Sequence, residues 1–200
     1  MPAPIDFYFD FTSPYGYIFA QHIDDLAARH GRSTVWHPFL LGMAFKTTGA
    51  VALPEIPLKG EYALRDIQRS ARFMGVPYRH PTRFPLPTQN AARSFYWLQD
   101  RHGALAKPFA LACLRALFVE DRDISSPAVV LDVAAAVGVD RAALEQALAD
   151  PAVKDRLRSE TEAAIARGVF GSPFTFIDGE PFWGGDRMPQ IERWLATGGF

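Results

Sequence analysis

The strands predicted from this sequence lie near its two ends. Residues 5–11 and Thr34–Leu41 are apolar, aromatic runs of the strand type, and one short helical segment separates them. Two strands joined by a helix are expected to run parallel, with a right-handed crossover. A second pair, 174–177 and 180–183, flanks an Asp-Gly turn and predicts a hairpin. The intervening residues 58–168 carry almost no strand signal, so this chain has to bring distant segments together into one sheet.

Helices account for the rest of the pattern. Apolar residues at helical spacing predict a helix that starts at Pro14 and stops at Gly31, and another near the end that contains Met188, Ile191 and Leu195. Six further helices are expected in the middle of the chain. Their predicted ranges are Tyr62–Met74, Thr88–His102, Pro108–Glu120, Pro127–Val137, Asp140–Leu148 and Pro151–Arg167.

The resulting order is β-α-β, then helices, then β-β-α. This order predicts an α/β protein with a thioredoxin-like fold and a helical domain inserted between the second and third strands. Residues 1–57 and 169–200 would form the thioredoxin-like domain, and residues 58–168 the inserted helical domain.

Composition narrows the functional classes. Of 200 residues, 48% are hydrophobic and 22% charged, as in folded proteins, and the net charge of −1 gives no support for nucleic-acid or membrane partners. Apolar runs are too short to span a bilayer, and residues 1–12 lack the features of a signal peptide, so we expect a cytoplasmic protein. The single cysteine, Cys113, lies in a predicted helix interior and is expected to be buried and inert. No histidine or cysteine spacing indicates a metal site.

The segment Ser13-Pro14-Tyr15-Gly16 lies where the first strand meets the first helix. Thioredoxin-type redox proteins carry Cys-x-x-Cys at this junction, but here Ser13 stands at the first cysteine position and Gly16 at the second. Disulfide chemistry is therefore disfavoured. The Ser13 hydroxyl could instead donate a hydrogen bond to the thiolate of another molecule, glutathione being the obvious candidate. The alternative is that Ser13 only caps the helix.

Four segments together resemble one family. Residues 9–17, 38–42, 168–173 and 182–187 are similar to motifs of the 2-hydroxychromene-2-carboxylate isomerases, in the same order and over essentially the whole chain. That family is related to the kappa-class glutathione transferases and, more distantly, to bacterial disulfide oxidoreductases.

The resemblance implies an enzyme that uses glutathione as a cofactor. Such isomerases interconvert 2-hydroxychromene-2-carboxylate and trans-o-hydroxybenzylidenepyruvate in aromatic catabolism. A thiolate adds reversibly to the conjugated acid, which allows rotation about the former double bond. The expected partners are a small aromatic carboxylate substrate and a second copy of the chain in a homodimer.

The resemblance also implies roles for particular residues. Ser13 would stabilise the thiolate, Ser172 would precede a cis Pro173 and pair with the glutathione backbone, and Lys59 would reach the tripeptide. Gly184, Gly185 and Asp186 would hold its γ-glutamyl end. A trans proline, a solvated lysine and a helix-capping aspartate are the corresponding structural alternatives.

Two positions depart from the family pattern. Ala50 and Pro87 stand where many members have asparagine, which leaves the substrate open. A kappa-like glutathione transferase or peroxidase is one alternative function. A non-catalytic thioredoxin-like binding module is another.

Overall fold

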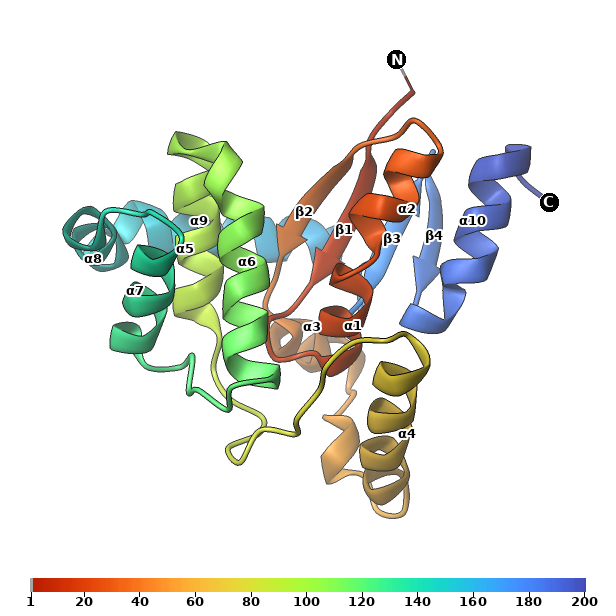
Figure 1. Cartoon of the computed structure of the whole chain (residues 1–200), viewed down its shortest axis with the longest axis horizontal. Coiled ribbons are helices and arrows are strands. Elements are labelled where there is room, and N and C mark those ends of the chain that lie inside the picture. Colours follow the sequence, from red (N-terminus) through yellow and green to blue (C-terminus); the bar gives the residue numbers. More distant parts are fainter. Residues whose placement is uncertain (1) are drawn as a thin grey trace.

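A four-stranded sheet forms the centre of the computed structural model, which describes residues 2–200 (Figure 1). Its strand order is β2-β1-β3-β4. β1 (Ile5–Phe9) pairs in parallel with β2 (Thr34–Pro38), whereas β3 (Phe174–Ile177) is antiparallel to both β1 and β4 (Glu180–Trp183). The sheet therefore joins the two ends of the chain, and the predicted α/β thioredoxin-like fold is confirmed.

The segment between β1 and β2 forms two helices where the sequence predicts one. α1 (Pro14–Ala20) and α2 (Ile23–Arg29) are separated at Gln21 and His22. β2 ends at Pro38, three residues before the predicted end. The predicted last residue, Leu41, is instead the first residue of α3 (Leu41–Thr48). A short 3-10 helix, η1 (Leu53–Glu55), follows α3.

The middle of the chain contains the six expected helices, with shifted ends. They are α4 (Lys59–Phe73), α5 (Gln89–Arg101), α6 (Gly103–Phe118), α7 (Pro127–Ala136), α8 (Arg141–Ala149) and α9 (Pro151–Ala166). The largest shift is in α6, where Pro108 lies inside the helix although the sequence places it at the start. Pro108 is the sixth residue of α6, so it lacks the N–H that would bond to the carbonyl of Ala104, and its ring crowds that carbonyl. After β4 come η2 (Gly185–Arg187) and α10 (Met188–Thr197).

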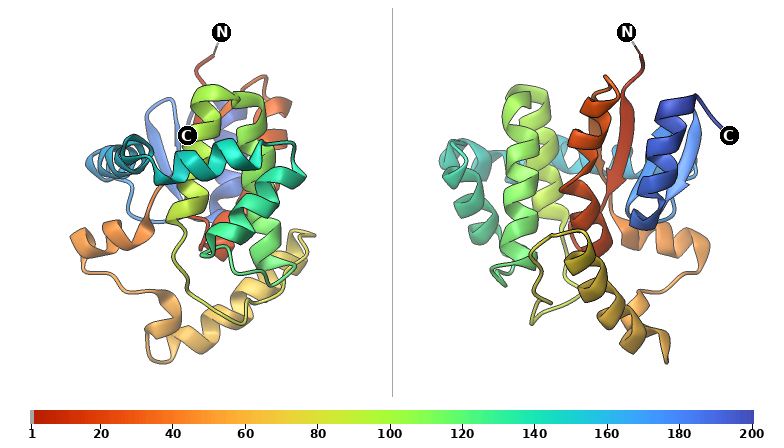
Figure 2. Two further views of the ribbon diagram at one scale, coloured as in Figure 1. Left: turned by 90° about the vertical axis from the view of Figure 1, so that its left-hand side faces the viewer. Right: turned by 45° about the vertical axis from the view of Figure 1, so that its right-hand side comes forward.

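The two faces of the sheet are covered differently. Phe7 and Phe9 of β1 belong to a large buried cluster that continues into α5 and α6, whereas Tyr8 points to a smaller cluster with residues of α9. This alternation follows from the two-residue period of a strand. α10 contributes Ile191 to the same large cluster as Phe7 and Phe9. In Figure 1, α5–α8 lie beyond the β2 edge of the sheet and α10 lies beside β4, and Figure 2 shows α4 at the end of the molecule farthest from the N terminus. The division into domains of 1–57 with 169–200, and 58–168, stays a prediction.

Two further expectations concern single features. Cys113 is fully buried in α6, as predicted, and burial raises the pKa of its thiol. Within residues 2–200, every helix is too short or too polar to cross a lipid bilayer.

Candidate active site

Ser13 caps α1, as the sequence predicts. Its backbone is extended (φ −86°, ψ 112°), and its Oγ accepts a hydrogen bond from the Gly16 N–H at 3.0 Å. Its carbonyl oxygen accepts from the Tyr17 N–H at 2.9 Å. The residue is only 5% exposed. The capping alternative is thus a real role of this side chain, and the question is what else it contacts.

Ser13 also contacts a segment 159 residues further along the chain. The Ser13 hydroxyl donates to the Ser172 carbonyl oxygen at 3.0 Å, and the Asp10 N–H donates to the Ser172 Oγ at 3.0 Å. The Ser172–Pro173 peptide bond is cis, as predicted. The strand-to-helix turn and the cis-proline turn therefore form one polar junction, even though neither segment signals the other in the sequence.

Gly16 fills the second cysteine position for a steric reason. A Cβ atom built on Gly16 would lie 2.7 Å from the Ser172 Oγ and 3.2 Å from the Ser13 Oγ. A side chain of any kind would displace one of the two serine hydroxyls. The present arrangement of the two serines therefore leaves no room for a side chain at residue 16.

Asp10 organises the same junction, and the sequence analysis did not identify it. The Asp10 carboxylate accepts from the Thr12 N–H at 2.9 Å, the Leu41 N–H at 2.7 Å and the Thr88 hydroxyl at 2.8 Å. Burial raises the pKa of this carboxyl group, and the three donors oppose that rise. The available signal was an acidic residue between Phe9 and Phe11, at the end of the predicted strand.

Gly184 and Gly185 lie at the same end of the sheet. The Gly184 N–H donates to the Pro173 carbonyl oxygen at 3.0 Å, and Gly184 has a φ of +109°, a conformation that favours glycine. Gly185 starts η2, where a Cβ would lie 3.9 Å from the Tyr15 carbonyl oxygen. The structure therefore brings the glycine turn against α1, next to the cis-proline turn.

Asp186 follows this turn but does not cap α10. The N-cap residue of α10 is Arg187, and it makes no side-chain capping bond. The Asp186 side chain is 74% exposed and lies 3.7 Å from the Arg187 guanidinium. The carboxylate is thus accessible from solvent, and the capping alternative is wrong for this residue.

Lys59 lies farther away. It is the exposed first residue of α4, and α4 is tied to α1 by the Tyr15 hydroxyl, which donates to Asp66 at 2.6 Å. Seven residues of helix, about 10 Å, separate Lys59 from Asp66. The structure therefore places Lys59 on a neighbouring helix without direct contact to the junction.

Several polar groups at the junction have no partner within residues 2–200. They are the backbone N–H groups of Tyr15 and Ser172 and the buried Thr12 Oγ1. A buried hydroxyl such as that of Thr12 is usually paired, and N–H groups in the first turn of a helix, such as that of Tyr15, bond to water or to a ligand. These groups are therefore available to a ligand. A peptide-like molecule with a thiol and two carboxylates offers acceptors for such donors, so the chemistry of these residues fits glutathione.

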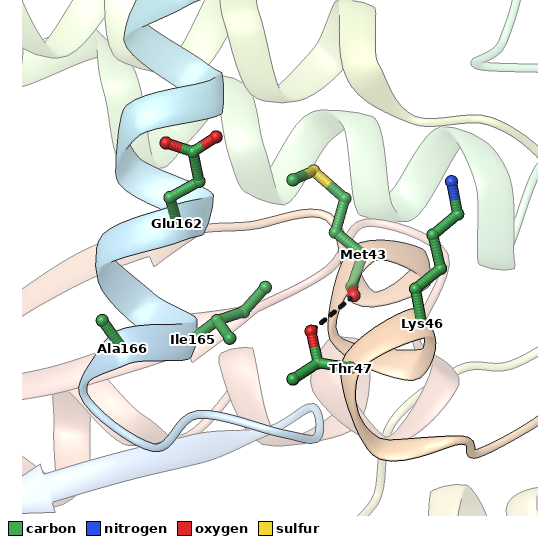
Figure 3. Close-up of a pocket in the computed structure, with 6 residues that line it drawn as sticks. All are labelled: Met43, Lys46, Thr47, Glu162, Ile165 and Ala166. Carbon is green, nitrogen blue, oxygen red and sulfur yellow. Dashed lines mark hydrogen bonds between the residues drawn. The ribbon is translucent and has the colours of Figure 1, made fainter.

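An open cleft lies elsewhere on the molecule. It has a volume of about 530 Å³ and is lined by Met43, Lys46 and Thr47 of α3 and by Glu162, Ile165 and Ala166 of α9 (Figure 3). It borders the smaller buried cluster and includes none of the predicted site residues. This cleft is therefore separate from the candidate site.

Fold and junction together define a thioredoxin-like protein in which serine replaces the first redox cysteine. The family of DSBA-like thioredoxin domains matches residues 4–196. A 2-hydroxychromene-2-carboxylate isomerase of Sphingobium xenophagum is 31% identical over 98% of this chain and 99% of its own length. The chain belongs to the 2-hydroxychromene-2-carboxylate isomerase family within this DSBA-like class.

Two other comparisons, one with an isomerase structure and one with a kappa-class transferase, give similar coverage of the chain. A solved structure of a 2-hydroxychromene-2-carboxylate isomerase superposes with a TM-score of 0.87 at 28% identity, covering 96% of this chain and 94% of its own. Glutathione s-transferase kappa 2 of Caenorhabditis elegans is 30% identical over 96% of this chain and 91% of its own length. Both groups resemble the chain over nearly its full length.

Proposed function

We propose that this protein is a glutathione-dependent isomerase of 2-hydroxychromene-2-carboxylate or a related aromatic acid. The observation that carries the proposal is the buried Ser13 hydroxyl held against the Ser172–Pro173 turn, with no cysteine at either redox position. The named relatives support the reaction class. When bound, glutathione would supply the thiolate that adds to the conjugated acid and leaves again.

The role of Ser13 follows from its hydrogen bonds. Its one hydroxyl proton points to the Ser172 carbonyl oxygen, while its oxygen accepts from Gly16. Rotation about the Cβ–Oγ bond would turn this proton toward a sulfur placed beside the junction. A donated hydrogen bond stabilises a thiolate relative to a thiol and lowers the thiol pKa. The open Tyr15 N–H would add a second donor from the same turn.

Other residues would hold the tripeptide. The open Ser172 N–H would pair with a peptide carbonyl, and the exposed Asp186 carboxylate would accept from an ammonium group. Gly184 and Gly185 allow close approach of a ligand backbone. Lys59 would attract a carboxylate from a distance rather than through a fixed contact. A cytoplasmic location and a homodimer belong to the same proposal.

A kappa-like glutathione transferase is the second candidate, because kappa relatives match nearly the full length of the chain. The two functions differ in stoichiometry. An isomerase changes the substrate chromophore without consuming glutathione, whereas a transferase consumes one thiol per turnover.

The test begins with calorimetric titration of reduced glutathione into the protein. We expect saturable binding, and then chromene carboxylate isomerisation that requires glutathione but leaves the total thiol concentration unchanged. Loss of one thiol per turnover would show that the protein is a transferase and not an isomerase. The absence of binding up to millimolar glutathione would reject both enzymes and favour the binding module.

A further inference from the structure

The hydroxyl group of Ser172 has a fixed oxygen and a free proton. Its Oγ accepts a hydrogen bond from the Asp10 N–H at 3.0 Å, which holds the side chain at the start of the cis-proline turn. Its own O–H proton has no acceptor among the described residues 2–200. A serine hydroxyl can donate one hydrogen bond while its oxygen accepts others, so this donor is available to a ligand.

The Ser13 hydroxyl is in the opposite state. Its proton already bonds to the Ser172 carbonyl oxygen at 3.0 Å, and the residue is only 5% exposed. A thiolate would have to break that bond to receive the Ser13 proton, whereas the Ser172 proton can be donated without loss of a protein hydrogen bond. Ser172 is also partly exposed. Of the two serines, Ser172 is therefore the readier donor.

The two hydroxyl oxygens lie beside the same point. A Cβ atom built on Gly16 would be 2.7 Å from the Ser172 Oγ and 3.2 Å from the Ser13 Oγ. A sulfur atom that approaches the Ser13 hydroxyl therefore enters a place that Ser172 also borders. An anion that accepts several hydrogen bonds is stabilised by each of them, and each lowers its pKa. The junction can thus supply two hydroxyl donors to one thiolate.

Hydrogen bonds on both sides of Ser172 hold it in place. Its carbonyl oxygen accepts from the Ser13 hydroxyl, and the next carbonyl oxygen, that of Pro173, accepts from the Gly184 N–H at 3.0 Å. A donor that is already in position stabilises negative charge better than one that must first be ordered. The Ser172 hydroxyl therefore has the fixed position that a donor to a thiolate needs.

We propose that the Ser172 hydroxyl donates a second hydrogen bond to the thiolate at the Ser13 junction. This inference rests on the proposed function for the source of the thiolate, which is glutathione, but the hydrogen bond itself does not require turnover. Ser172 then acts through its side chain as well as through its backbone N–H. Together with Ser13 it lowers the pKa of the bound thiol, so that more of the cofactor is thiolate at neutral pH.

A thiol placed in the protein itself tests this donor without glutathione. Ser13→Cys puts sulfur in place of the Ser13 oxygen, and the pH dependence of thiolate ultraviolet absorbance gives the pKa of the new thiol. Cys113 is fully buried and burial raises its pKa, so it does not interfere. Adding Ser172→Ala should raise the pKa of the new thiol by about one, because a hydrogen bond to a charged group is lost. The ratio of thiolate to thiol then falls about tenfold at a given pH.

Threonine and valine at residue 172 separate the hydroxyl from the shape of the side chain. In the Ser13→Cys protein, Ser172→Thr keeps a hydroxyl and Ser172→Val has nearly the same shape without one, so only the valine should raise the pKa. Ser94→Ala is the matched control, because the buried Ser94 hydroxyl bonds within α5 to the Asn90 carbonyl oxygen at 2.8 Å. This control should leave the pKa unchanged. Equal pKa values with threonine and valine at residue 172 would overturn the proposal.

Glutathione binding gives a second readout in the protein that keeps Ser13. Ser172→Ala should weaken the binding of reduced glutathione about tenfold in calorimetry, because the thiolate loses a charge-assisted hydrogen bond. S-methylglutathione has no thiol proton to lose, so its Kd should stay nearly the same. Equal weakening for both ligands would mean that Ser172 only holds the tripeptide, and it would overturn the donor role.

Two outcomes separate this inference from the proposed function. If the wild type bound no glutathione while Ser172→Ala still raised the thiol pKa of Ser13→Cys, the thiolate donor would stand and the proposed function would fall. If glutathione-dependent isomerisation occurred but neither readout depended on the Ser172 hydroxyl, the function would stand and this inference would fall. Should Ser172→Ala not fold, the threonine and valine variants carry the same comparison in both readouts.

Discussion

Ser13 and Asp140 are both N-cap residues, yet their surroundings differ. Each side chain accepts from backbone N–H groups of the helix that it starts, Ser13 from Gly16 and Asp140 from Ala142 and Ala143. Asp140 is exposed and bonds only within its own helix. Ser13 is buried and also bonds to Ser172, on a distant turn.

This difference separates a cap from a candidate site. The local sequence pattern of a capping residue is the same in both places, and it stabilises the helix in both. The second, long-range bond occurs only at Ser13, beside a backbone N–H that has no partner. Long-range contact therefore distinguishes the two positions, and matched substitutions can test whether it matters.

The largest effect is expected from replacing the two caps in parallel. Ser13→Ala and Asp140→Ala should each lower the free energy of unfolding by about 1 kcal/mol, the usual cost of a lost cap. Only Ser13→Ala should reduce turnover, by about 100- to 1000-fold, because it removes a donor to developing charge. Urea unfolding and glutathione-dependent isomerisation are measured on the same preparations. Near-normal turnover in Ser13→Ala would reduce Ser13 to a cap like Asp140.

A second comparison uses glycines in the two surroundings. Gly16→Ala would place a methyl group 2.7 Å from the Ser172 Oγ, so it should destabilise the fold by about 1–3 kcal/mol and weaken glutathione binding. Gly42→Ala lies in α3 with nothing within 4 Å of the added methyl group and should be neutral or stabilising by up to about 1 kcal/mol. Melting temperature and calorimetric Kd report the two effects. Intact glutathione binding in a folded Gly16→Ala would show that the two serines tolerate displacement.

The sequence predicted the strands well because their signal is local. A few residues are enough to show the aromatic run Phe7-Tyr8-Phe9 and the Asp178-Gly179 turn. The break between α1 and α2 was missed. The start of α3 was also missed, because the Leu41 N–H at that start bonds to the distant Asp10 carboxylate. Asp10 was missed for the same reason. Its importance depends on partners that only the folded chain defines.

The smallest effect is a difference in pH dependence between two aspartates. Burial raises the pKa of Asp10 above its ordinary value of 3.8, so the folded state binds more protons than the unfolded state just above that pH. The contribution of Asp10 to stability therefore falls as the pH rises from 3.8 through the raised pKa. Asp123 is the opposite case, because hydrogen bonds from Ser125 and the nearby Arg83 lower its pKa. Its contribution is present above 3.8 and is lost as the pH falls through the lowered pKa.

Asparagine substitutions isolate these two slopes. As the pH rises above 3.8, the wild type should lose stability relative to Asp10→Asn. As the pH rises toward 3.8, the wild type should gain stability relative to Asp123→Asn. Urea unfolding from about pH 3 to 7 measures both. Parallel slopes would mean that the three donors outweigh burial at Asp10.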